Sequence, residues 1–145
     1  MRALALVLPH ARTLKDLYLG NNLISDAGAR ALAEALPRLP ALEHLYLNDN
    51  SIGDEGARAL AEALPRVQAL WKINLEDNSI GDAGARALAA ALPHWPVMER
   101  QGTSRRVPEL SGNSIGDAGK AALRTACEGR NIGLAFGVDP RNPDP

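Results

Sequence analysis

Residues 42–69 read LEHLYLNDNSIGDEGARALAEALPRVQA, and this stretch is one copy of a pattern that repeats along the chain. The copy before it begins at Leu14 and the copy after it begins at Leu70, so the spacing is a constant 28 residues. Three copies therefore cover 14–41, 42–69 and 70–97 without a gap. A fixed period of this length predicts a solenoid, in which each copy is one supersecondary unit stacked on its neighbours.

Each copy first follows a strand pattern and then a helix pattern. Leu45 and Leu47 alternate with polar or amphipathic residues, as a strand with one buried face requires. Leu60 and Leu64 are four residues apart, which places both on one helix face, and the alanines between them favour a helix. We expect an aspartate at each helix start to accept free backbone N–H groups, and a proline to end the helix. These residues are Asp26, Asp54, Asp82 and Asp117, with Pro37, Pro65 and Pro93.

The repeated motif resembles a known family. Each copy contains L-x-x-L-x-L-x-x-N-x-I followed by G-A-R-A-L-A-x-A-L-P, with Ile73 replacing one leucine in the third copy. This pattern resembles the ribonuclease-inhibitor-like class of leucine-rich repeats over roughly residues 2–136. The resemblance implies an α/β fold, a right-handed solenoid that forms a horseshoe segment, with a parallel sheet on the concave side and helices on the convex side. It does not by itself imply a partner.

The two ends of the chain depart from the full repeat. Residues 1–13 align with the end of an earlier copy, so we expect a partial N-terminal repeat formed by the end of a helix. Its apolar side chains lack a polar cap, which favours self-association through that end. Residues 130–136 are expected to form a C-terminal capping strand, and residues 137–145 a disordered tail. Whether the chain is a fragment of a longer protein stays open.

The fourth copy, residues 98–126 and continuing to about 129, is irregular. It matches the third copy at an offset of 35 residues, so seven residues are inserted between Met98 and Leu110. Pro108 falls at a strand position, where it cannot donate to a sheet ladder. Two interpretations stay open. The inserted segment is a protruding basic binding loop, or it is a local interruption of the strand or an error in the gene model.

An asparagine stands at the turn between each predicted strand and helix. The turn is stacked between copies, where backbone groups have no regular partner, and an amide can both donate to and accept from them. We interpret these residues as a structural ladder, with a polar ligand-binding column as the alternative. They are Asn22, Asn50, Asn78 and Asn113.

Charge and composition exclude several classes of function. Sixteen Lys and Arg residues against 17 Asp and Glu residues give a net charge of −1, which argues against nucleic acid or an anionic membrane as the partner. No apolar run approaches the roughly 20 residues that a bilayer-spanning helix needs. The single cysteine, Cys127, cannot form an internal disulfide, so we expect a reducing, cytoplasmic compartment.

Signals for catalysis, metals and cofactors are scarce. His10 and His94 are equivalent residues three copies apart, and at about 4.8 Å per strand they are too distant to share a metal. The turns at 53–56 and 81–84 lack the lysine of a Walker loop and the third glycine of a dinucleotide-binding fingerprint. We therefore expect no enzyme activity, no cofactor and no metal site.

The predicted sheet offers a surface for recognition. Successive strands place their outward residues in columns, and Tyr18, Tyr46 and Trp71 fall on or beside this face. Tyrosine and tryptophan dominate the contact energy of many interfaces. The alternative is that the two tyrosines pair across neighbouring strands and only stabilise the sheet. The candidate partner-binding residues are Asp16, Tyr18, His44, Tyr46, Asn48, Trp71, Lys72, Asn74 and Glu76.

The sequence therefore predicts a noncatalytic module that binds another protein, of unknown identity, through the concave face of a leucine-rich repeat solenoid. Two other classes stay open. Similar repeats occur in GTPase-activating proteins of the RanGAP type, which supply residues from their loops. They also occur in receptors that resemble the NOD-like family, of which this chain would be a fragment of the sensor arm.

Overall fold

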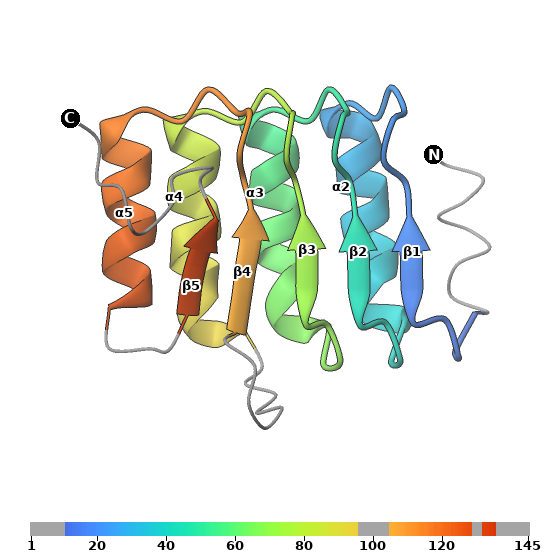
Figure 1. The fold of residues 1–145 in the computed structure, drawn as a ribbon. Helices are drawn as coiled ribbons and strands as arrows, with labels where there is room; N and C mark the ends of the chain where they lie inside the picture. The colour runs from blue at the N-terminus through green and yellow to red at the C-terminus, as the bar shows by residue number, and fades with distance from the viewer. Residues whose placement is uncertain (1–10, 96–104, 129–131, 136–145) are drawn as a thin grey trace.

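The protein folds into a parallel sheet covered on one side by a row of helices (Figure 1). The computed structural model describes residues 11–95, 105–128 and 132–135. The strands are β1 (Asp16–Tyr18), β2 (His44–Tyr46), β3 (Lys72–Asn74), β4 (Arg105–Glu109) and β5 (Ile132–Ala135). They lie in the sheet in chain order, and all neighbouring pairs are parallel. This is the α/β solenoid that the repeats predict.

Each of the strands β1 to β4 is followed by a helix that precedes the next strand. The helices are α2 (Asp26–Ala35), α3 (Asp54–Ala63), α4 (Asp82–Ala91) and α5 (Asp117–Cys127). The first three continue into short 3-10 turns, η2 (Leu36–Arg38), η3 (Leu64–Arg66) and η4 (Leu92–His94), each of which contains one of the expected helix-ending prolines. Proline fits there because its missing N–H is not needed at the start of a turn.

The register of the sheet follows the repeat period. Asp16 pairs with His44 and His44 pairs with Lys72, so residues 28 apart in the sequence lie side by side. Leu45 and Ile73 point away from the open face and are fully buried. Leu60 of α3 and Leu64 of η3 reach the same core and are also fully buried. The core between the two layers is therefore a leucine and alanine core, to which Trp95 adds a nearly buried ring whose Nε1 donates to the Leu70 carbonyl at 3.0 Å.

The asparagine side chains bridge neighbouring repeats through the backbone. Asn78 Nδ2 donates to the Leu47 carbonyl of the preceding repeat at 2.9 Å, and Asn78 Oδ1 accepts the Ile52 N–H at 3.0 Å. Asn50 and Asn113 make the same pair of contacts one repeat earlier and one repeat later. Asn22, in the first full repeat, donates to the carbonyls of Leu19 and Gly20. These are the hydrogen bonds expected of a structural ladder.

The aspartates at the helix starts act differently from the expectation. Asp26 opens α2, yet its Oδ1 accepts the N–H groups of Gly53 and Gly56, at 2.7 and 2.8 Å, at the start of α3. The stacking of repeats brings the carboxylate of one helix beside the free N–H groups of the next, so capping runs between repeats and not within one. The same arrangement joins Asp54 to α4 and Asp82 to α5.

The fourth repeat forms a strand, β4, in the region where an interrupted strand was one of the two interpretations. β4 includes Pro108, but its pairing with β3 is limited to Asn74 with Glu109, and its pairing with β5 shifts register between Arg106 and Glu109. The contact with the third repeat is made by the residue after the proline, Glu109, whose carbonyl accepts the Leu75 N–H at 2.8 Å. The strand is thus irregular but present.

Several expectations fall outside the described residues. These are residues 1–10 of the partial repeat expected over 1–13, residues 99–104 of the segment between Met98 and Leu110, and the tail expected over 137–145. β5 lies within the range expected for a capping strand. The division of the chain into repeats at the boundaries given above stays a prediction.

Candidate functional site

The candidate residues lie on the face of the sheet that the helices do not cover, which we call the sheet face. Asp16 and Tyr18 of β1 are exposed there. The candidates on β2 and β3 and in the segments beside these strands are half-buried, with one exception. The exception is Asn74, which is only 9% exposed. The half-buried candidates are His44, Tyr46, Asn48, Trp71, Lys72 and Glu76.

Two tyrosines form a stack on the sheet face. Tyr18 and Tyr46 pair in register across β1 and β2, and their ring centroids lie 4.6 Å apart with an interplanar angle of 5°. Lys72, on the other side of β2, places its Nζ 5.2 Å from the centroid of the Tyr46 ring. Tyr46 is therefore held between a ring from β1 and a cation from β3, and Tyr18, at 69% exposure, forms the open end of the stack.

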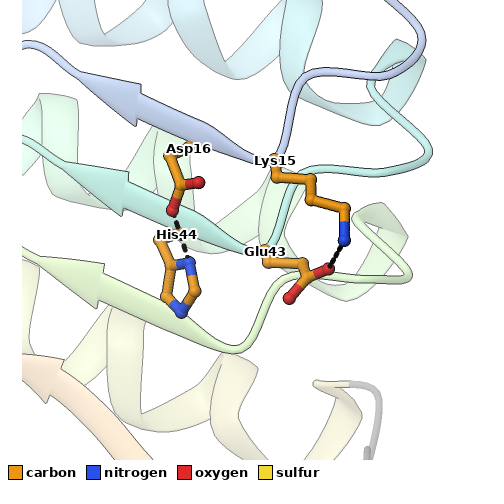
Figure 2. Close-up of polar contacts among 4 residues, drawn as sticks. All are labelled: Lys15, Asp16, Glu43 and His44. Atoms are coloured by element: carbon orange, nitrogen blue, oxygen red, sulfur yellow. Dashed lines mark hydrogen bonds and ion pairs between the residues drawn. The ribbon is translucent and has the colours of Figure 1, made fainter.

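A second group of contacts surrounds His44 on the same face. Its Nδ1 lies 2.7 Å from the Asp16 carboxylate, and its ring makes an edge contact with Trp71 at a centroid distance of 5.6 Å. Next to it, Lys15 and Glu43 form an ion pair at 3.1 Å between the starts of the same two strands (Figure 2). These contacts connect the aromatic residues of three strands into one continuous surface.

Asn74 departs from the exposure expected for its column. Its side chain bonds to the residue two positions later: Oδ1 accepts the Glu76 N–H at 2.8 Å, and Nδ2 donates to the Glu76 carboxylate at 3.0 Å. On the adjacent strand, Glu109 of β4 forms an ion pair with Lys72 at 3.2 Å. The column of tyrosines therefore ends at β3, where the surface becomes polar.

The environment of Tyr18 favours its neutral form. Partial desolvation and the nearby negative charge of Asp16 raise the pKa of the Tyr18 hydroxyl above its ordinary value, and contact with Tyr46 acts in the same direction. A tyrosine hydroxyl is already protonated at neutral pH at its ordinary pKa, so this shift leaves Tyr18 a hydrogen-bond donor.

Two further features at the ends of the strands were not predicted. Leu23 is 93% exposed, and its equivalents in the following repeats are serines, Ser51 and Ser79. Asp49 and Asp77 adopt positive φ angles of 54° and 50° in the turns that leave β2 and β3. The exposure of Leu23 could have been predicted by aligning the repeats, because serines at the equivalent positions indicate a column that lies outside the core.

Comparison with known proteins agrees with this geometry. A family model described as Leucine Rich repeat matches residues 10–33, 39–61 and 70–89. Over these residues the chain matches leucine-rich repeats. A solved structure titled "Leiomodin-1 Actin-Binding Site 2 (ABS2)" shares the fold of these repeats with a TM-score of 0.72 at 16% identity, over 92% of this chain and 78% of that one. A comparison with curated proteins found no match.

The leucine-rich repeats also form a groove on the helix side, between α2 and α3. It has a volume of about 360 Å³ and a mixed lining of arginine, glutamate and alanine side chains. Arg58 and Glu55 form an ion pair within it. Because positive and negative side chains alternate there, the groove has no marked preference for a charged ligand. Its lining residues are Arg30, Ala33, Glu34, Glu55, Arg58, Ala59, Glu62, Ala63 and Arg66.

Among the residues that the structure describes, no three His, Cys, Asp or Glu side chains are grouped as a metal site would need. None of the helices over the same residues has the length and apolar character to cross a membrane.

Proposed function

We propose that this protein is a noncatalytic recognition module that binds another protein through its sheet face, the side that becomes concave in a curved solenoid. The observation that carries this proposal is the exposed stack of Tyr18 on Tyr46, which continues through His44 to Trp71. Aromatic side chains with few rotatable bonds supply large contact areas at low entropic cost. The 28-residue period and the strand–helix alternation also support the ribonuclease-inhibitor-like subclass.

Recognition of a partner explains more features of the sheet face than stabilisation of the sheet does. A cross-strand pair contributes about 0.2 to 1 kcal/mol to a sheet, which is sufficient reason for Tyr18 to stack on Tyr46. It is not a reason for an aromatic array over three strands with one tyrosine still 69% exposed. His44, Lys72 and Glu76 lie around the rings and would provide polar selectivity for the partner.

Actin is the first partner to test. The structural neighbour is titled as an actin-binding site, and at 16% identity the likeness concerns the fold alone. Cosedimentation of the purified chain with actin filaments, and a pull-down with monomeric actin, would support or remove this candidate directly. Removal of actin as a partner would leave the sheet-face proposal in place.

The two other classes make different predictions. A GTPase activator of the RanGAP type would accelerate GTP hydrolysis by a small GTPase in a turnover assay. A receptor fragment resembling the NOD-like family would be encoded with a nucleotide-binding domain upstream. No observed feature of the sheet face favours either one over recognition.

Photo-crosslinking tests the proposed surface. A photoreactive phenylalanine derivative placed at position 46 adds an aromatic side chain where one already lies, and the same residue placed at position 62 samples the exposed surface of α3. We expect a protein partner to be crosslinked from position 46 and not from position 62. Crosslinking from position 62 alone would contradict the proposal.

A further inference from the structure

The sheet face of this protein carries a group of carboxylates, most of them near the ends of its strands. Among the described residues, strands β1 to β3, the residue before each strand and the turns that leave them, together with Glu109 of β4, carry six carboxylates and two lysines, and β4 also contains Arg105 and Arg106. The helices and 3-10 turns carry both signs in equal number, with seven basic and seven acidic residues. The sheet-face residues are Asp16, Glu43, Asp49, Glu76, Asp77 and Glu109, with Lys15 and Lys72. The helix-side residues are Arg30, Arg38, Arg58, Arg66, Arg86, Lys120 and Arg124, with Asp26, Glu34, Asp54, Glu55, Glu62, Asp82 and Asp117.

The two lysines of the sheet face are already paired. Lys15 contacts Glu43, and Lys72 contacts Glu109. The carboxylates that remain are concentrated where the strands end, at the arrowheads in Figure 1, and we call Asp49, Glu76 and Asp77 the exit rim. Within the described part of the chain, the exit rim makes no ion pair; Asp49 and Glu76 accept hydrogen bonds only from the amides of neighbouring asparagines.

Apolar and aromatic side chains are exposed beside the exit rim. Tyr18 and Leu23 are the most exposed large apolar residues that the structure describes, and both belong to the first full repeat. Leu23 shares its turn with Asn21, the equivalent of Asp49. The tyrosine stack already holds one cation, Lys72, at its Tyr46 end, whereas Tyr18 makes no cation contact among the described residues. A second cation fits the open Tyr18 ring face for the same electrostatic reason.

From these observations we infer that the sheet face docks a basic segment of a partner protein, with arginine or lysine on the exit rim and on Tyr18, and an apolar side chain on Leu23. This inference rests on the proposed function and gives its partner a chemical class. The argument is charge complementarity: a surface with unpaired carboxylates attracts cations, repels acidic partners and excludes nucleic acid.

The repeats supply variants that remove the charge with little structural risk. Asn21 occupies the position of Asp49 and Asp77 with a similar positive φ, and Asn48 occupies the position of Glu76. The variant Asp49→Asn, Glu76→Asn, Asp77→Asn therefore neutralises the exit rim with residues that the fold already accepts there. The matched control, Glu34→Ala, Glu55→Ala, Glu62→Ala, removes three carboxylates from the helix side, where Ala90 and Ala83 are the equivalents.

The probe is a pair of peptides of equal length and identical leucine positions, one with arginine and one with glutamate at every polar position. Binding to the full chain is followed by fluorescence anisotropy at low and at physiological salt. We expect the arginine peptide to bind more weakly as salt rises, and the exit-rim variant to lose about tenfold in affinity. The helix-side control should bind as the unmodified chain does, and Leu23→Ser should also weaken binding.

Three results would overturn the inference: no binding of the arginine peptide, equal binding of both peptides, or equal losses for the exit-rim variant and the helix-side control. The Tyr46→Asn variant separates this inference from the proposed function. If Tyr46→Asn weakens binding and the exit-rim variant does not, the sheet face remains the binding surface and the basic partner is wrong. If only the exit-rim variant weakens binding, the aromatic sheet-face proposal fails.

Discussion

The carboxylate of Asp26 accepts the backbone N–H of Gly56 from the following repeat at 2.8 Å. This contact joins the starts of two successive helices and recurs at the next two boundaries. It satisfies a donor that a helix start otherwise leaves without a partner. The stacking of repeats and the capping of helices are therefore one structural feature.

The Asp54→Ala variant tests this capping. Removal of the carboxylate leaves the Gly81 and Gly84 N–H groups without their acceptor, so we expect a loss of about 1 to 2 kcal/mol in the free energy of unfolding, measured with urea. Asp117→Ala is the matched control, because Asp117 caps no following helix among the described residues. Equal losses for the two variants would show that the aspartates act within their own helices.

The Gly56→Ala variant tests how closely the helices pack. Helix propensity alone predicts that alanine stabilises α3 by about 1 kcal/mol. A Cβ atom at Gly56, however, would lie 2.6 Å from Asp26 Oδ1 and 3.0 Å from Ala29 Cβ. We expect steric overlap to exceed the gain in propensity, so that the variant is less stable by about 1 to 3 kcal/mol in the same urea assay. A more stable variant would contradict this packing.

Replacement of a core leucine tests the orientation of the helices. Leu60 is fully buried between α3 and the sheet, so Leu60→Ala should reduce the free energy of unfolding by about 2 to 5 kcal/mol. Arg58 lies on the exposed side of the same helix in an ion pair with Glu55, and Arg58→Ala should reduce it by less than about 1 kcal/mol. Comparable losses would mean that α3 is rotated relative to the sheet.

The repeat period accounts for most of what could be predicted from the sequence. Because the spacing is constant, the pairing of Asp16 with His44 and the burial of Leu45 follow from aligning the copies. The stacking of Tyr18 on Tyr46 follows in the same way. Strand register and core burial therefore agree with the aligned pattern in the regular repeats.

The features that could not be predicted depend on contacts that no single copy of the repeat contains. The alternation of β3 places Asn74 outward, but its burial depends on how its amide folds onto Glu76 and on the irregular strand beside it. The acceptor role of Asp26 requires the distance between two helix starts, which no single copy contains. The exit rim was missed because Asp49 and Asp77 lie beyond the strand pattern, in turns with positive φ.

The most direct test of the sheet-face proposal is the affinity of the Tyr46→Asn variant for the partner crosslinked from position 46. Asn74 already occupies the equivalent position in the next repeat, so the fold should accept the substitution with little change in melting temperature. We predict that binding weakens by about 1 to 3 kcal/mol, which is roughly 5- to 150-fold in the dissociation constant. Unchanged affinity for Tyr46→Asn, together with a loss for Glu34→Ala or Glu62→Ala on the helices, would contradict the account.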